Sequence, residues 1–303
     1  PVGVVGIITP WNFPIAIPSW KAAPALAFGN TVVLKPADLV PASAWSIADI
    51  LSRAGVPEGV FNLVMGSGSV VGNAIINHKD VSAVTFTGST KTGRSVAEAC
   101  VKRLARVQLE MGGKNPMVVL DDADLDVAVA ASFNGAFIST GQRCTASSRL
   151  IVQQGIHDKF VAAMIERLKK TKIDNALEAG TEIGPVVDQR QLDQDMSYID
   201  IAQKEGAKLA WGGELLNRKT QGFYLNCALI TETNNTSSIL VLNGGAFTQN
   251  VAFNGTAGNT LTVHTVGTAT YTQNGYFGIG NTGGLIKADD GTMNLNNLAV
   301  FIG

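Results

Sequence analysis

The sequence has 303 residues, of which 46% are hydrophobic and 16% are charged, and its formal net charge is −1. This composition excludes wholesale disorder, and the even charge balance sets aside a protein that holds nucleic-acid backbones. No apolar run reaches the ~18 residues that predict a membrane span. The three cysteines, Cys100, Cys144 and Cys227, lack the paired spacing of a disulfide framework or a zinc site. We therefore expect a cytoplasmic protein that binds no nucleic acid, membrane or metal.

Strand and helix signals alternate along residues 1–235. Short apolar runs rich in β-branched residues predict strands over residues 2–8, 31–34, 61–65, 81–87, 107–111, 117–120 and 150–153. Helices are predicted over residues 43–53, 70–76, 93–103, 125–138 and 157–170, with Ser43 as the cap of the first. Strands joined by helical crossovers predict an α/β fold with a largely parallel sheet.

Residues 236–303 have a different composition, with no proline and only three of the 47 charged residues. Such an abrupt change predicts a domain boundary near residue 235. Polar and apolar residues alternate over residues 260–266, and Phe253, Phe277 and Phe301 recur at intervals of 24 residues. The repeat suggests a β-rich tail of solenoid-like stacked strands or a hairpin array, and coincidence in a low-complexity segment is the alternative.

Two features follow predicted strands and suit a nucleotide. Gly88 and Gly93 enclose a strand-to-helix turn, where backbone N–H groups can hold a phosphate. The alternative is an ordinary tight turn, because the spacing is not the usual dinucleotide fingerprint. Lys35 and Asp38 follow another strand, where they could bind ribose hydroxyls. For this pair a solvated loop is the simpler interpretation.

Three polar residues are candidates for catalysis. Cys144 lies in a polar segment beside Arg143, which would favour the thiolate if its side chain points that way. Burial as a small hydrophobe is the common alternative for a lone cysteine, and Cys100 and Cys227 fit it. Glu110 precedes paired glycines and could act as a base, or could pair with Lys114. Asn12 could donate to an oxyanion or could satisfy turn backbone groups.

The order of these features is more specific than any one of them. Residues 9–14, 35–38, 86–90, 109–114 and 141–144 read TPWNFP, KPAD, FTGST, LEMGGK and GQRC. In this series they strongly resemble the NAD(P)-dependent aldehyde dehydrogenase superfamily, over residues 1–234. The wording of residues 15–21 and 145–149 is most similar to the branch that acts on 2-oxoglutarate semialdehyde, with succinate-semialdehyde enzymes close behind.

The resemblance implies oxidation of a small-molecule aldehyde to a carboxylic acid. Cys144 would attack the carbonyl carbon, and the Asn12 amide with the Cys144 backbone N–H would hold the oxyanion. Hydride would pass to the nicotinamide and leave a thioester, which Glu110 would hydrolyse by activating water.

The resemblance also implies an NAD or NADP site built from the carboxyl ends of the strands. Lys35 and Asp38 would contact the adenosine ribose, and Asp38 stands where the family more often has glutamate, so the choice between NAD and NADP stays open. The implied cofactor-binding residues are Ile8, Thr9, Pro10, Trp11, Lys35, Asp38, Gly68, Gly72, Phe86, Thr87, Gly88, Ser89, Gly93, Met111 and Gly112.

Parts of the family pattern are not found, which predicts an internal fragment. The expected segments are a partial dinucleotide-binding domain over residues 1–111, a partial catalytic domain over 112–235 and the unrelated tail over 236–303. The family's Glu-x-Phe-Gly-Pro segment and its oligomerisation strand are among the missing parts, so both the competence of this chain and the homo-oligomer that the resemblance implies stay open. The join between the family-like part and the tail, near residue 235, could be a gene fusion or an artefact of sequence assembly. The alternatives are a structural or surface β-solenoid protein with a non-catalytic remnant, or a nicotinamide-binding module without catalysis.

Overall fold

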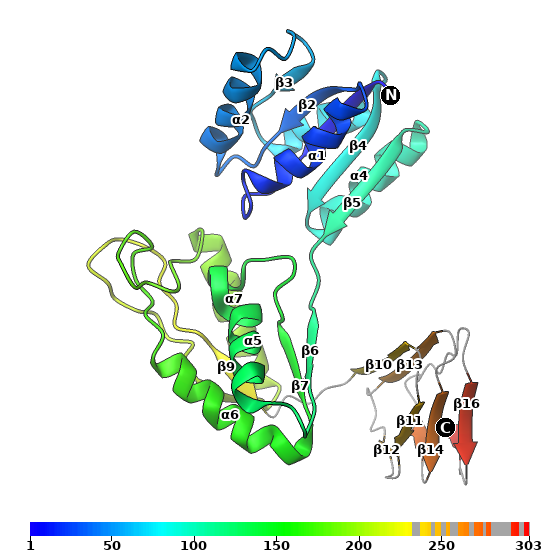
Figure 1. Cartoon of the computed structure of the whole chain (residues 1–303), viewed down its shortest axis with the longest axis vertical. Helices are drawn as coiled ribbons and strands as arrows, with labels where there is room; N and C mark the ends of the chain where they lie inside the picture. Colours follow the sequence, from blue (N-terminus) through cyan, green and yellow to red (C-terminus); the bar gives the residue numbers. More distant parts are fainter. Residues whose placement is uncertain are drawn as a thin grey trace. The chain divides into compact units, whose positions relative to one another are not determined.

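The computed structural model describes residues 1–231 and the backbone of strands between residues 237 and 302 (Figure 1). Contacts between residues divide the chain into two units. Unit 1 comprises Pro1–Asp188 and Leu215–Cys227, and unit 2 comprises Gln189–Glu214 and Ala228–Gly303. The segment boundary predicted at residue 111 lies inside unit 1 and stays a prediction. The predicted join near residue 235 lies outside the described residues.

A five-stranded parallel sheet forms the first part of unit 1. Its strands are β1 (Val4–Ile8), β2 (Thr31–Lys35), β3 (Phe61–Leu63), β4 (Val81–Gly88) and β5 (Arg106–Met111). Their order in space is β3-β2-β1-β4-β5, and every neighbouring pair is parallel. The expected α/β parallel sheet is therefore confirmed for this region. The strand order reverses between β1 and β4, which is where sheets of this kind bind ligands at their carboxyl ends.

Helices cover both faces of this sheet (Figure 1). On one face α1 (Ala16–Ala27) and α2 (Pro41–Arg53) contribute Ala22 and Ala44 to a cluster with Val5, Ile7, Val32 and Leu34. On the other face α3 (Asn73–Asn77) and α4 (Thr90–Lys102) pack Ile75, Ile76, Val96 and Cys100 against Val84 and Phe86. Alternate residues of β1 thus enter two separate cores, with Val5 and Ile7 on one face and Val4 and Ile8 on the other, which explains why this strand is apolar along its length.

Two local expectations were wrong in detail. The helix expected from Ser43 begins at Pro41 and has no side-chain cap, because the N-cap residue Val40 has no hydrogen-bond acceptor in its side chain. The helix expected over 70–76 is one π-helical turn, η1 (Gly68–Gly72), followed by α3. Sequence reasoning did not predict α1 at all, because Pro24 lies inside it and interrupts the helical signal.

The rest of unit 1 carries a second, smaller parallel pair. Strand β6 (Pro116–Val119) pairs with β7 (Arg149–Val152), and helices α5 (Leu125–Phe137) and α6 (Gln154–Lys169) follow β6 and β7 in the chain. The short turn η2 (Ile138–Gly141) follows α5. Asp124 caps α5 by accepting from the backbone N–H of Val127. The α5–η2–β7 connection therefore positions the segment that contains Cys144.

Unit 2 begins with α7 (Gln189–Lys204), β8 (Lys208–Trp211) and β9 (Leu229–Thr231), and β8 and β9 are antiparallel. Its further strands are β10 (Ser237–Asn243), β11 (Ala246–Gln249), β12 (Phe253–Asn254), β13 (Thr260–Val266), β14 (Thr270–Asn274), β15 (Phe277–Ile279), β16 (Thr292–Asn296) and β17 (Val300–Ile302). They pair in parallel as β10-β13, β11-β14-β16 and β12-β15-β17. Partners such as Ser237 and Thr260, or Thr270 and Thr292, lie 22 to 24 residues apart.

Candidate active site

A backbone hydrogen bond joins the carboxyl ends of β1 and β2, and an ion pair lies at the end of β2. The N–H of Thr9 donates to the carbonyl oxygen of Lys35 at 3.1 Å. The Lys35 side chain is buried, and its Nζ lies 3.0 Å from Oδ1 of the exposed Asp38. Ile8, Pro10 and Trp11 are half-buried around this edge. The Lys35–Asp38 pair therefore presents one buried ammonium and one accessible carboxylate beside the strand ends.

The carboxyl ends of β4 and β5 meet at the start of α4. A Cβ atom at Gly88 would lie 2.5 Å from Cζ of Phe86, and one at Gly93 would lie 2.5 Å from Sδ of Met111. A Cβ at either position would force the side chain of Phe86 or Met111 to move, so glycine lets the strand ends pack closely against the first turn of α4. The Ser89 side chain caps that turn. This geometry is the close strand-to-helix approach that a bound phosphate needs.

Three other predicted glycines are in open surroundings. A Cβ atom at Gly68, Gly72 or Gly112 would meet no other heavy atom within 4 Å. Packing within the described part of the chain therefore gives no steric reason for glycine at these positions. Their place beside a nucleotide stays a prediction.

Buried polar atoms without partners lie at the same edge. The side-chain oxygens Oγ1 of Thr9, Oγ1 of Thr87 and Oδ1 of Asn12 are buried, and none has a hydrogen-bond partner in the described part of the chain. Leaving such atoms unpaired costs about 1–3 kcal/mol each. Thr9 directly follows β1, and Thr87 is the second-last residue of β4; these are the two strands at the reversal of strand order. The orphaned atoms therefore fit a polar ligand, and a dinucleotide offers the hydroxyl and amide groups they need.

The segment before Cys144 has a strained backbone. Ser139, Thr140 and Gly141 have φ angles of 60°, 54° and 66°, in the left-handed region. Two of the three residues carry a Cβ, and each such residue costs roughly 1–2 kcal/mol in this conformation. Backbone strain of this kind persists only where surrounding contacts hold it.

Hydrogen bonds from three other segments hold this loop. Asn12 Nδ2 donates to the Gln142 carbonyl oxygen at 2.9 Å, and the Val187 N–H donates to Gln142 Oε1 at 3.2 Å. Asn115 Nδ2 donates to the Cys144 carbonyl oxygen at 2.8 Å. Asn12 is therefore bonded to Gln142, two residues before Cys144. Its role as an oxyanion donor stays a prediction.

The Arg143 side chain does not point toward the thiol. Its guanidinium donates to the backbone oxygens of Asn134 and Gly135 in α5. The condition for Arg143 to favour a Cys144 thiolate directly is therefore not met, because carbonyl oxygens in the last turn of a helix attract the cation.

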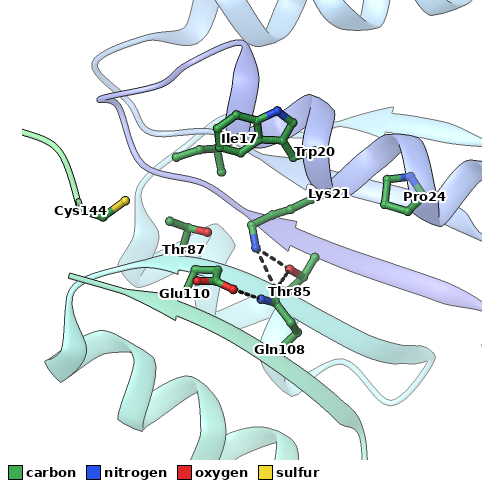
Figure 2. Close-up of a pocket in the computed structure, with 9 residues that line it drawn as sticks. All are labelled: Ile17, Trp20, Lys21, Pro24, Thr85, Thr87, Gln108, Glu110 and Cys144. Atoms are coloured by element: carbon green, nitrogen blue, oxygen red, sulfur yellow. Dashed lines mark hydrogen bonds between the residues drawn. The ribbon is translucent and has the colours of Figure 1, made fainter. Parts of the chain in front are cut away.

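Cys144 and Glu110 line one pocket of about 480 Å³ (Figure 2). Helix α1 supplies an apolar wall on one side, and β4 and β5 supply polar side chains on the other. The lining residues are Ile17, Trp20, Lys21, Pro24, Thr85, Thr87, Gln108, Glu110 and Cys144. An exposed thiol and an exposed carboxylate in one mostly apolar pocket are the pair that nucleophilic and base catalysis needs.

A chain of hydrogen bonds crosses this pocket from α1 to Glu110 (Figure 2). Lys21 Nζ donates to Thr85 Oγ1 at 2.6 Å and to Gln108 Oε1 at 2.9 Å. Gln108 Nε2 then donates to Glu110 Oε1 at 2.7 Å. Burial lowers the pKa of Lys21 below 10.5, and the negative charge of Glu110 partly opposes that shift.

Sequence reasoning missed the α1 side of the pocket and the network. Lys21 is the one charged residue of the twelve in α1, which is a signal for a functional position. Gln108 lies two residues before Glu110 in β5, so strand alternation places both side chains on one face. That alternation could have identified Gln108, whereas Thr85 and Trp20 required the tertiary structure.

The other two cysteines are buried, as expected for packing residues. Burial raises the pKa of the Cys100 thiol, and it raises the pKa of Cys227 to about 12. Among the described residues no group of His, Cys, Asp and Glu could hold a metal ion. No helix in that same part of the chain has the length and apolar character needed to cross a membrane.

The sequence is similar to known proteins of one family. The model of the aldehyde dehydrogenase family matches residues 1–241. The α-ketoglutaric semialdehyde dehydrogenase of Bacillus subtilis is 51% identical over 231 residues, which cover 76% of this chain and 47% of that protein. Mouse retinaldehyde dehydrogenase 3 is 47% identical over 217 residues, which cover 71% and 42%.

A solved structure shows the same likeness in three dimensions. Betaine aldehyde dehydrogenase from Staphylococcus aureus, in complex with NAD+, has a TM-score of 0.76 and 41% identity, and the match covers 77% of this chain and 47% of that chain. The chain thus spans about half the length of the curated relatives it matches. With a family match over most of its residues, the chain belongs to the aldehyde dehydrogenase family.

Proposed function

We propose that this chain carries the site that oxidises an aldehyde to a carboxylic acid, with NAD or NADP as the oxidant. The observation that carries the proposal is the pocket shared by the Cys144 thiol and the Glu110 carboxylate. This pocket lies beside the carboxyl ends of β4 and β5, next to the reversal of strand order where dinucleotides bind.

The first step uses Cys144 and Asn12. The thiolate of Cys144 adds to the carbonyl carbon, so a C–S bond forms and the carbonyl π electrons move to oxygen. An amide nitrogen has two hydrogens, and Asn12 gives one to the Gln142 carbonyl. Its second hydrogen and the Cys144 backbone N–H stabilise the oxyanion.

The fit of the nicotinamide cofactor rests on the strand ends. Lys35, with Asp38, would hold the adenosine ribose, the α4 start at Gly88 and Ser89 would hold phosphate, and the orphaned Thr9 and Thr87 hydroxyls would receive polar atoms. When bound, the nicotinamide accepts the hydride that leaves the aldehyde carbon, and Cys144 is left as a thioester. A 2′-phosphate would meet the Asp38 carboxylate, so we expect NAD to bind more tightly than NADP.

The last step uses Glu110. Its carboxylate takes a proton from water while the water oxygen adds to the thioester carbonyl. The C–S bond then breaks, the electron pair returns to the Cys144 sulfur, and the acid leaves. Aldehyde, NAD(P)⁺ and water are thereby converted to acid, NAD(P)H and a proton.

A dicarboxylic semialdehyde is the substrate that we propose to test first. The Bacillus subtilis relative is named for α-ketoglutaric semialdehyde, and a Saccharolobus solfataricus relative, 45% identical, is named for 2,5-dioxopentanoate. Lys21 places a cation at the polar side of the pocket, which suits a substrate with a carboxylate.

The test uses the full chain with NAD⁺ and a semialdehyde, and it follows NADH absorbance together with intact mass. We expect an acyl adduct on Cys144 that Cys144→Ala abolishes and Glu110→Gln makes longer-lived. Absence of both NADH and adduct would reject oxidation by this chain. If NAD⁺ then still protected Cys144 from thiol labelling, the chain would be a nicotinamide-binding module without catalysis.

We propose a structural role for the strands between residues 237 and 302 as a second candidate function. The parallel partners at intervals of 22 to 24 residues support a coil of stacked strands, as in a β-solenoid of a surface or adhesive protein. Hydrogen exchange of the full chain tests this role. Slow exchange is expected for the amides of β14 and β15, because each lies between two partner strands, and for those of β13, which pairs with β10 over its whole length. Complete exchange of these amides at the earliest time would reject the coil.

A further inference from the structure

The orientation of the Gln108 amide is determined by its two neighbours. Lys21 has only donors, so the oxygen of the amide must face Nζ, at 2.9 Å. An ionised Glu110 has only acceptors, so the amide nitrogen must face Oε1, at 2.7 Å. The Thr85 hydroxyl accepts from Lys21 and donates to the same Gln108 oxygen. All three contacts therefore require the same orientation of the Gln108 amide, and exchanging its oxygen and nitrogen would break each of them.

We propose that Gln108 is a positioning residue that holds the Glu110 carboxylate for thioester hydrolysis and anchors it through Thr85 and Lys21 to α1. The inference rests on the proposed function, because it assigns Gln108 a role in the step that Glu110 performs. The effect of Gln108 on the reaction passes through Glu110.

The geometry explains why the position matters. Gln108 and Glu110 are both exposed, so side-chain packing does little to restrict the rotamers of Glu110. The hydrogen bond from Gln108 occupies Oε1 and leaves Oε2 to take the proton of the attacking water. Lys21 and Thr85 hold Gln108 in turn, from a helix and a strand that belong to the folded core. A general base needs such fixed placement within hydrogen-bond reach of its water.

The test separates acylation of Cys144 from hydrolysis of the thioester and needs no nicotinamide. The full chain is treated with p-nitrophenyl acetate, and the release of p-nitrophenolate reports acylation while intact mass reports loss of the acetyl group. For Gln108→Leu we expect acylation within about twofold of wild type. Deacylation is expected to fall about tenfold, the size of one charge-assisted hydrogen bond.

Two further variants make the test specific. In the Glu110→Gln background, Gln108→Leu is expected to cause no additional loss, because its effect passes through the carboxylate. Gln108→Glu keeps the shape but gives Lys21 an ionic partner and offers Glu110 no hydrogen, so we expect slow deacylation with a shifted pH profile. The matched control is Gln189→Leu, because Gln189 donates to Asp193 at the same distance of 2.7 Å, on α7.

The possible outcomes distinguish the positioning role of Gln108 from the proposed function of the chain. Deacylation of Gln108→Leu at the wild-type rate, with Glu110→Gln slow, would overturn the role of Gln108 and leave the proposed function standing. An equal loss from Gln108→Leu with and without the Glu110 carboxylate would also overturn it. Failure of the wild-type chain to be acylated at Cys144 would overturn the proposed function and this inference together. Gln108→Leu and Gln189→Leu should melt as wild type does, because both side chains are exposed.

Discussion

The five-stranded sheet and the strands beyond residue 237 both pair in parallel, but their partners have different spacings in the sequence. In the sheet, Val5 pairs with Val32 on one side and with Ala83 on the other. Beyond residue 237 the spacing stays at 22 to 24 residues. Unequal spacing brings loops from distant parts of the sequence to one edge, where Thr9, Lys35 and Gly88 meet. A near-constant spacing repeats one local arrangement, which suits a scaffold better than a catalytic centre.

The largest expected effect tests whether the sheet is stabilised by its own core. Leu34 in β2 is fully buried, and Leu34→Ala is expected to cost about 3 kcal/mol of unfolding free energy through lost burial and a cavity. The cost should be the same in the full chain and in a chain that ends at Thr231, as measured by urea denaturation. A clearly smaller cost in the shorter chain would mean that the two regions depend on each other.

The strained loop before Cys144 gives an intermediate effect. Ser139→Gly should stabilise unit 1 by about 1 kcal/mol, because glycine adopts a φ of 60° without a Cβ penalty. Ser139→Val should destabilise it, because a β-branched residue is disfavoured there. Thermal denaturation measures both changes. Equal midpoints for the two variants would mean that this loop is not held in the left-handed region.

The smallest effect concerns pH and Lys21. Because the folded pKa of Lys21 is lowered below 10.5, the unfolded chain binds more protons than the folded chain between these two values. Stability from this group therefore rises with pH through that window and is constant below it. We expect the urea midpoint of wild type to rise relative to that of Lys21→Met as pH approaches 10.5. If the urea midpoints of the two proteins changed equally with pH, the burial of the Lys21 ammonium would be contradicted.

The sequence allows the sheet strands to be predicted because their signal is local. The apolar runs at residues 2–8 and 81–87 contain or overlap β1 and β4, since both faces of a parallel sheet are buried. Helix α1 could not be predicted in this way, because Pro24 interrupts its pattern and tertiary contacts with the strands of the sheet stabilise it. The predicted segment boundaries remain predictions.

The candidate site likewise contains residues that the sequence identifies and residues that only the tertiary structure identifies. Cys144, Glu110 and Asn12 could be named from motifs, and the structure brings Cys144 and Glu110 to one pocket. The network around Glu110 could not be named, because Lys21 and Gln108 are 87 residues apart in the sequence. Contacts between such distant residues depend on the order of the strands, which no local pattern contains.

The unequal burial of the three thiols has a practical consequence for kinetics. Cys144 is exposed, Cys100 is a buried residue of α4 in the core, and Cys227 lies at the end of the segment Leu215–Cys227. Under native conditions a thiol reagent can reach the two buried sulfurs only when their surroundings open. The labelling rates of Cys100 and Cys227 would then report the opening of two different parts of the fold, in one experiment and without an added probe.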